Sequence, residues 1–451
     1  MIALITTLIV LGIAIYLLKQ KIEIKWIMFL SGILLMIVAI FLKIPLLTEE
    51  KRSGIPFFDL FKVIGNVFTN QLTGAGFILM LLFGYTAFMK QIGANQMTVD
   101  LLSRPLARLK FKALLIPLFY VIGNILGLII PSASSLSVLL MTTAYPILVS
   151  AGVSPLGVAA VIAMSATIAP TPLGADNILA SEALSMEVGT YVFDYHAKVS
   201  LPVIFILMIV HFFWQSFCDK RESETDDLIQ LSSIEKEEPL AFVPRLYAIL
   251  PMLPLVLLML FNVGLNKSGV GMVEVTLCSF VLSILCEVIR TRSLRQGFES
   301  IQSFFDGMGV GFTTVVIQVV AAMTFVEGLK IIGVIDFLTT QVQQLASAGV
   351  ILMLLFSLLA LSVGLLSGSG LALFYACVEL MPQFSSAVNP MMLAIPMQFV
   401  SHLVKSISPV SPTVIIISSM LNVPVQRLLK RTIVPALVGM VLSLILSYVL
   451  F

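Results

Sequence analysis

The chain has 451 residues, of which 59% are hydrophobic and only 11% are charged, and its formal net charge at pH 7 is +2. A soluble domain of ordinary composition carries about 25% charged residues, so this composition excludes a soluble protein and indicates a chain that lies almost entirely in lipid. The small net charge gives no indication of nucleic-acid binding.

Hydrophobic segments of helical length, rather than short alternating strands, predict an all-α polytopic membrane protein. The four cysteines are scattered in or beside these segments and fit neither a disulfide framework nor a metal-binding pattern. We therefore predict no metal, no cofactor and no catalytic residue. The first segment, Ile2–Leu18, has no basic region before it, and we interpret it as a retained span rather than a signal peptide.

In chain order, the first half begins with two predicted spans, Ile2–Leu18 and Trp26–Leu47. An amphipathic helix over Pro56–Asn70, expected to lie at the membrane surface, precedes a third span over Ala75–Met89. A basic amphipathic segment, Ala94–Lys112, follows. Apolar spans therefore alternate with surface segments, as in a protein that crosses the bilayer repeatedly.

Polar residues interrupt the next elements of the first half. Residues 113–150 predict a re-entrant hairpin, because a proline and several serines stand in the middle of an apolar stretch. Residues 153–187 predict a broken helix, because Pro170 and Pro172 lie within it and each lacks the N–H that a helix needs. A last span, Leu201–Phe217, closes the first half.

The second half repeats this plan after a hydrophilic linker, residues 219–241. Its predicted elements are spans over 246–261, 273–288 and 310–326, a hairpin over 348–384, a broken helix over 391–421 and a last span over 434–450. The predicted domains are therefore a first repeat over residues 1–218, the linker, and a second repeat over residues 242–451.

Short motifs recur in the same order in the two halves. Phe57-Phe58-Asp59 recurs as Phe304-Phe305-Asp306, and Thr167-Ile168-Ala169-Pro170 recurs as Ser406-Ile407-Ser408-Pro409. Because each repeat is expected to cross the membrane an odd number of times, the two repeats are predicted to be inverted. The fold predicted is about ten transmembrane helices plus two re-entrant hairpins. The distribution of lysine and arginine predicts that both termini lie outside.

Inverted repeats with paired broken helices are typical of secondary transporters, whose sites lie at the repeat interface. Broken helices expose N–H groups and positive dipole ends that suit a carboxylate, and nearby hydroxyl groups add donors. We predict a substrate shell of Ser132, Ser134, Ser135, Thr167, Ser367, Ser369, Lys405, Ser406 and Ser408. A serine in an apolar helix commonly bonds its own preceding turn instead, and this alternative stays open for each serine taken alone.

Four of the polar residues near the breaks carry the most specific hypotheses. Lys405 is a costly intramembrane cation that usually marks a functional cavity, although a lysine can also extend to the membrane surface. Asp176, Asn177 and His402 are the candidates for binding a coupling ion or proton, either H⁺ or Na⁺. The alternatives are a helix cap for Asp176 and a structural polar residue for His402.

Motifs along nearly the whole chain resemble one known family. They are Gly84–Met89 with Ile92–Asn95, Leu136–Met141, His211–Gln215, Gly368–Gly370, Phe374–Glu379, Ser408–Ser411 and Lys430–Thr432. Together they resemble the DcuC family of anaerobic C4-dicarboxylate carriers, within the larger ion-transporter superfamily. In this family a cation tends to precede the Ser-Pro break, where this chain has Lys405.

The resemblance implies a carrier that takes up, exchanges or exports succinate, fumarate or malate across a bacterial inner membrane, with cation coupling. It also implies an elevator-type arrangement and a homodimer. The hairpin tips of the superfamily often read Ser-Asn-Thr, whereas this chain has Ser134-Ser135-Leu136 and Ser369-Gly370-Leu371, so the coupling ion stays open. The alternative is a carrier of the same fold for another carboxylate or an amino acid. An intramembrane enzyme and a channel are disfavoured.

Overall fold

A computed structural model describes residues 2–20, 22–103, 105, 114–130, 132–222, 243–261, 270–342 and 348–451. Every regular element among these residues is a helix, which confirms the all-α prediction. The predicted linker, residues 219–241, lies mostly outside the described residues, and so does the basic end of the segment Ala94–Lys112.

The first half begins with a series of helices that ends in an arm. They are α1 (Ile2–Lys19), α2 (Ile24–Phe41), the short helix η1 (Glu49–Lys51), α3 (Pro56–Thr73), α4 (Ala75–Gln91) and α5 (Ala94–Ser103). The chain bends by 49° between α3 and α4. Gly74 forms this bend, so the helix predicted at the membrane surface and the third span point in different directions.

The rest of the first half covers the ranges predicted as hairpin and broken helix. Its elements are α6 (Leu115–Ile129), α7 (Ala133–Thr142), α8 (Ala144–Ser150), α9 (Pro155–Met164), α10 (Ala175–Ala183), α11 (Val188–Thr190), the π-helical turn η4 (Tyr191–His196) and α12 (Ala197–Glu222). Residues 165–174 separate α9 from α10, and this non-helical stretch contains Pro170 and Pro172.

The described part of the second half is also helical. Its first elements are the 3₁₀ helix η6 (Arg245–Met252), α13 (Leu253–Met259), α14 (Met272–Thr291), α15 (Leu294–Glu299), α16 (Gln302–Gly311), the π-helical turn η8 (Phe312–Val316), α17 (Ile317–Ile331) and α18 (Val334–Val342). They are followed by α19 (Ala348–Ser367), α20 (Leu371–Val378), η9 (Met381–Phe384), α21 (Pro390–Leu403), η10 (Val404–Ser406), α22 (Pro412–Met420) and α23 (Val425–Leu450).

One helical run differs from the expected division into separate elements. The segment Leu294–Ile331 forms one path of 38 residues, which is longer than the span predicted over residues 310–326. Glycines let this path lie directly on α4, because a Cβ atom at Gly311 would be 2.9 Å from the Cβ atom of Phe83. Gly311 therefore lets this path approach α4 closely, and the path continues without a bend like the one at Gly74.

Six helices are long and apolar enough to cross a membrane, and eight if each of two bent pairs counts as one span, among the residues that the structure describes. Three further apolar helices are shorter: Leu115–Ile129, Pro155–Met164 and Arg245–Met259. The structure therefore confirms a helical protein with several apolar spans, and the number of about ten transmembrane helices stays a prediction.

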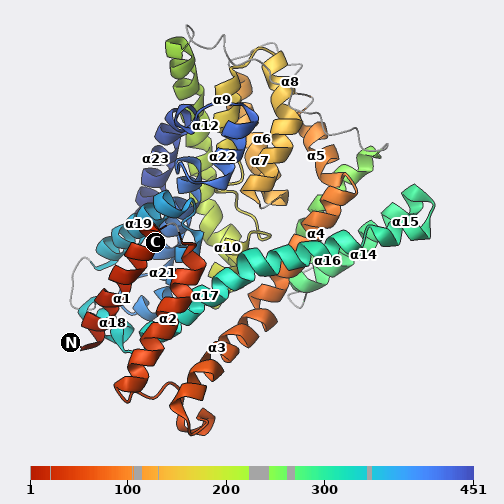
Figure 1. Ribbon diagram of the computed structural model, residues 1–451. Helices are drawn as coiled ribbons and strands as arrows, with labels where there is room; N and C mark the ends of the chain where they lie inside the picture. The colour runs from red at the N-terminus through yellow and green to blue at the C-terminus, as the bar shows by residue number, and fades with distance from the viewer. Residues whose placement is uncertain are drawn as a thin grey trace.

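The helices form two groups that pack against each other through α17 and α20, and each group contains elements from both halves of the chain (Figure 1). In the first group α2 packs against α17, and α4 packs against α14 and α16. In the same group α1 contacts α18, and η6 contacts α5. The second group brings α6, α9, α12 and α19–α23 together. Figure 1 shows α3, α14, α15 and α16 extending away from this second group.

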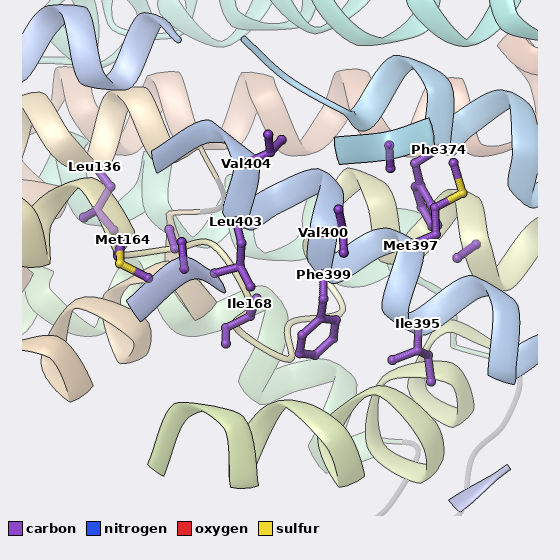
Figure 2. Close-up of a cluster of buried hydrophobic side chains, with 14 of the residues drawn as sticks. Leu136, Met164, Ile168, Phe374, Ile395, Met397, Phe399, Val400, Leu403 and Val404 are labelled. Atoms are coloured by element: carbon purple, nitrogen blue, oxygen red, sulfur yellow. The ribbon is translucent and has the colours of Figure 1, made fainter. Parts of the chain in front are cut away.

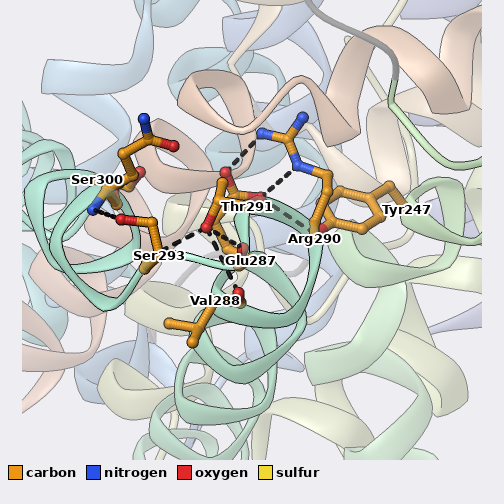
Figure 3. A network of polar contacts seen from close by, with 8 residues as sticks. Tyr247, Glu287, Val288, Arg290, Thr291, Ser293 and Ser300 are labelled. Carbon is orange, nitrogen blue, oxygen red and sulfur yellow. Dashed lines mark hydrogen bonds and ion pairs between the residues drawn. The ribbon is translucent and has the colours of Figure 1, made fainter.

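A polar network at one end of α14 holds the first group together (Figure 3). Glu287 is only 3% exposed, accepts a hydrogen bond from the Tyr247 hydroxyl at 3.1 Å and pairs with Arg290 at 2.5 Å. The Arg290 guanidinium also lies 5.7 Å from the centre of the Tyr247 ring. Because a buried charge requires a partner, these contacts fix η6 against α14.

The centre of the second group is α21, which is buried on all sides (Figure 2). Phe399 and Leu403 on this helix have no exposed surface. An apolar helix without a polar face belongs in a core. Pro396 lies inside α21 and does not end it. The polar residues near the end of this helix, Gln398 and His402, are therefore held in the interior of the protein.

Candidate functional site

Each broken helix packs against the hairpin of its own half. The hairpins are α6–α8 and α19–α20, and the broken helices are α9–α10 and α21–α22. In the first half, a Cβ atom at Gly127 on α6 would lie 2.7 Å from the Cα atom of Ala166 in the break. In the second half, Gly368 has a φ of +85°, and a Cβ atom there would lie 2.7 Å from the Val410 carbonyl oxygen. Glycine in both hairpins therefore lets backbone touch backbone at the two interruptions.

Each hairpin also contacts the broken helix of the other half. The hydroxyls of Ser134 in the first hairpin and Thr413 in α22 are 3.2 Å apart, and α7 packs along α22. In the other hairpin, α20 packs against α10. The return helix of each hairpin therefore lies against the second segment of the opposite broken helix.

A buried polar network joins the two broken helices. The Asp176 carboxylate on α10 lies 2.8 Å from His402 Nε2 on α21 and also accepts a hydrogen bond from the Gln398 amide. The same amide donates to Asn177 Oδ1 at 2.7 Å, and the Gln398 carbonyl oxygen accepts from the Tyr191 hydroxyl at 2.6 Å. The carboxylate therefore bonds across the protein to α21, whereas the N-cap residue of α10 is Gly174.

Lys405 extends this network toward the second break, which is formed by residues 407–411 between η10 and α22. Its Nζ atom is 3.3 Å from His402 Nδ1, and among the described residues no carboxylate forms an ion pair with it. Lys405 follows the end of α21 and Asp176 lies in the first turn of α10. Both charges are thus on the favourable side of a helix dipole.

A small cavity opens beside the first break. Its volume is about 20 Å³, and it is lined by residues of the break, including Thr167 and Thr171, together with Asp176, His196 and His402. This volume is about that of one water molecule. The imidazole Nδ1 of His196 is buried and makes no hydrogen bond within the described chain. An acid, two imidazoles and hydroxyl groups therefore surround a space for one very small polar guest.

Tyr191 of this network and His196, which lines the cavity, both lie on the π-helical turn η4. A π-helical turn adds a residue to a helix and often re-aims side chains at a functional site. Here Tyr191 reaches Gln398, and the His196 ring lies 4.9 Å from the Phe399 ring. The turn therefore directs both side chains toward α21.

Four of the predicted substrate hydroxyls donate to backbone carbonyls. Thr167 donates to Met164 at 2.8 Å, Ser367 to Val363 at 2.8 Å, Ser406 to Leu403 at 2.7 Å, and Ser408 to Leu365 at 2.9 Å. The first three bonds lie within one helical turn, which is the alternative left open for single serines. The Ser408 bond instead ties the second break to α19.

The remaining predicted hydroxyls lie at the hairpin tips. Ser132 caps α7 and donates to Ser135 Oγ at 3.0 Å. Ser135 accepts that bond, and Ser369 Oγ accepts from the Leu371 N–H at 3.3 Å. A hydroxyl that accepts a bond still has its own proton to donate. Ser135 and Ser369, one in each hairpin, are therefore free to donate to a carboxylate.

The structure also places other polar residues at the breaks that the sequence did not single out. Gln398 and Tyr191 belong to the buried network, and His196 lines the cavity beside it. Ser401 and Ser411 have buried hydroxyls without a hydrogen-bond partner within the described chain. Ser411 belongs to the Ser408–Ser411 motif, and this motif is the sequence feature that could have identified it as a site residue. No group of three His, Cys, Asp or Glu side chains suited to a metal ion occurs among the described residues.

The fold is similar to the folds of two solved membrane transporters. The YdaH transporter of Alcanivorax borkumensis superposes with a TM-score of 0.57 over 88% of this chain and 89% of that one, at 14% identity. MtrF of Neisseria gonorrhoeae, whose structure illuminates a class of antimetabolite efflux pumps, gives a TM-score of 0.54 over 88% of this chain and 84% of that one, at 12% identity. At such low identity the likeness concerns the fold alone.

The family is shown by sequence. The sequence model of DcuC, described as C4-dicarboxylate anaerobic carrier, matches residues 1–451. The anaerobic C4-dicarboxylate transporter DcuC of Escherichia coli strain K12 is 33% identical over 448 residues, 98% of this chain and 95% of the relative. A probable DcuC transporter of Vibrio cholerae is 32% identical over 426 residues, 93% and 92% of the two chains. The chain therefore belongs to the DcuC family, a family of transporters and not of enzymes.

Proposed function

We propose that this protein is a secondary active transporter of C4-dicarboxylates such as succinate, fumarate and malate, located in a bacterial inner membrane. Its family and the names of its relatives support this substrate class. The observation that carries the proposal is Lys405, a cation at a broken helix whose neighbour is an imidazole and not a carboxylate. Such a cation is available to neutralise a substrate carboxylate.

Lys405 would supply the fixed positive charge, and hydroxyl groups would supply neutral donors around it. The hydroxyls available to donate are those of Ser135 and Ser369 at the hairpin tips and Ser401 and Ser411 beside the second break. In the repeat alignment the residue matching Lys405 is Ala166. The charge of the site therefore comes from the second half alone.

Substrate binding would require movement of the hairpins. The cavity beside the first break has about 20 Å³, which suits one water molecule and is too small for a dicarboxylate. We propose alternating access in which the second group of helices, with both hairpins, moves against the first as in an elevator. The reciprocal packing of α2 with α17 and of α14 with α4 supports inverted repeats.

Asp176, Asn177 and His402 are the proposed site for the coupling cation, H⁺ or Na⁺. The Asp176 carboxylate and His402 line the water-sized cavity, and Gln398 bonds both Asp176 and Asn177. A proton or a small ion bound there would change the charge next to Lys405 and so link ion binding to dicarboxylate binding. The homodimer and the outside location of both termini stay predictions.

The proposal is tested with purified protein in proteoliposomes. Vesicles loaded with succinate should take up external labelled fumarate, and external malate should compete. Loss of exchange under every sodium and pH gradient would contradict the substrate class. A thermal-shift screen of dicarboxylates, monocarboxylates and amino acids distinguishes the alternative, because only the bound class should raise the melting temperature.

A further inference from the structure

The Lys430–Thr432 motif lies outside the buried network around Asp176, yet it makes a direct contact with the second break. We propose that Thr432 on α23 is a positioning residue for Lys405, and this inference rests on the proposed substrate site. Thr432 has no exposed surface, and its hydroxyl donates to the Ser406 carbonyl oxygen at 2.6 Å. Ser406 directly follows Lys405, so Thr432 holds the backbone that carries the cation.

The Ser406 carbonyl needs this donor because the helix is broken there. In an intact helix it would accept from the N–H of Val410, but that N–H is directed to Ser408 Oγ at 3.4 Å. A buried carbonyl without a partner is costly. Within its own helix, Thr432 has longer contacts of 3.2 Å to Leu429 and 3.4 Å to Leu428. The bond to Ser406 is therefore the main one.

The residue before Thr432 fixes α23 to α12. Arg431 has no exposed surface and pairs with Asp219 at 2.5 Å. Arg431 also donates to the Gln215 carbonyl oxygen at 3.3 Å, while the Gln215 side chain donates to the Arg431 carbonyl oxygen at 3.0 Å. These reciprocal bonds prevent α23 from rotating or sliding on α12. Thr432 is therefore presented to the break by a fixed support.

The held segment is short, so its position determines where the Lys405 side chain points. Val404–Ser406 forms the single 3₁₀ turn η10 between the end of α21 and the non-helical residues 407–411. With the Ser406 carbonyl fixed, Lys405 Nζ is placed against His402 Nδ1. Without the Thr432 hydroxyl, the turn can shift and the cation loses its preferred position. Binding of the substrate should weaken, because part of the binding free energy is then used to order the Lys405 side chain.

The test compares variants of nearly equal shape. Thr432→Val removes the hydroxyl, and Thr432→Ser keeps it. The matched control is Thr276→Val, because Thr276 also has no exposed surface and its hydroxyl bonds its own helix at Met272. We expect Thr432→Val to raise the apparent KM for succinate roughly tenfold, given the loss of one buried hydrogen bond, with little change in kcat. Thr432→Ser and Thr276→Val should leave KM close to that of the original protein.

Lys405→Ala separates this inference from the proposed function on which it rests. If Lys405→Ala raises KM and Thr432→Val does not, the positioning role is overturned while the substrate site stands. If Lys405→Ala leaves KM unchanged, the substrate site is overturned together with the positioning role. In the double variant, Thr432→Val should not raise KM further than Lys405→Ala does alone. Fully additive effects of the two substitutions on KM would contradict the inference. Thr432→Ala provides the same comparison if Thr432→Val is not recovered folded.

Discussion

The carboxylate of Asp176 and the imidazole of His402 lie 2.8 Å apart, although they come from opposite halves of the chain. Asp176 lies in the first turn of the second segment of one broken helix, and His402 lies in the last turn of the first segment of the other. The contact therefore joins the two interruptions into one buried unit, with Lys405 as its next member.

Asp176→Asn should uncouple transport. The amide keeps the shape of the carboxylate but cannot take up a proton or neutralise a cation. We expect succinate–fumarate exchange at equal concentrations to continue, while accumulation driven by a pH or sodium gradient falls at least about tenfold. Labelled uptake into proteoliposomes measures both activities. Asp336→Asn on α18, an exposed carboxylate, is the control. Normal gradient-driven accumulation by Asp176→Asn would remove Asp176 from the coupling site.

A covalent bond between the first hairpin and α22 should stop alternation. The Ser134 and Thr413 hydroxyl oxygens are 3.2 Å apart, so cysteines at these positions come within reach of a disulfide. In a background in which serine replaces Cys218, Cys278, Cys286 and Cys377, which form no disulfide in the described chain, oxidation of the Ser134→Cys/Thr413→Cys protein should block exchange. Reduction should restore it, and neither single cysteine should respond. Exchange at full speed by the cross-linked protein would show that this contact persists throughout the cycle.

Glu182→Ala should loosen the contact between the two groups of helices. The Glu182 carboxylate on α10 accepts the N–H of Ala75, the first residue of α4, at 3.1 Å. First-turn N–H groups have no acceptor within their helix, and a capping carboxylate contributes about 0.5–1 kcal/mol. We expect a lower melting temperature and faster hydrogen exchange in the peptide containing Ala75. Glu182→Gln should retain part of the protection, and exchange at the original rate in Glu182→Ala would contradict this role.

Gly368→Ala should destabilise the second hairpin tip more than an equivalent change elsewhere. Gly368 has a φ of +85°, and a Cβ atom would lie 2.7 Å from the Val410 carbonyl. Gly333 has a φ of +80° but open space around it. Gly333→Ala therefore incurs only the backbone strain of about 1–2 kcal/mol, whereas Gly368→Ala adds overpacking of about 1–3 kcal/mol. Melting temperatures in detergent compare the two variants, and equal losses would show that the tip adjusts freely.

The breaks could be found in the sequence because proline and hydroxyl residues occur together there. Pro170 and Pro172 coincide with the interruption between α9 and α10, whereas Pro396 alone leaves α21 intact. A single proline can be accommodated in a helix when neighbours satisfy the freed carbonyl. Proline by itself is therefore a weaker signal of a break than proline beside several serines or threonines.

The partners of the site residues could not be predicted from sequence. Gln398 lies within an otherwise apolar run, and Tyr191 is one of several polar residues near the start of a span. Only the packing of the two halves brings them together near Asp176. The hydroxyls also differ in a way that spacing does not reveal. Ser406 donates to a carbonyl within its own turn, whereas Ser135 accepts a bond and keeps its proton for another partner. Which of these bonds a hydroxyl makes depends on the local backbone geometry.

Direct binding of succinate to Lys405 variants tests the central claim most directly. Titration calorimetry on purified protein should give a Kd that rises at least about tenfold in Lys405→Ala, since a charged hydrogen bond contributes about 1.5–3 kcal/mol. Lys405→Arg should bind with an intermediate Kd because it keeps the charge in a different shape. Succinate binding by Lys405→Ala with an unchanged Kd would contradict the assignment of this lysine to the substrate site.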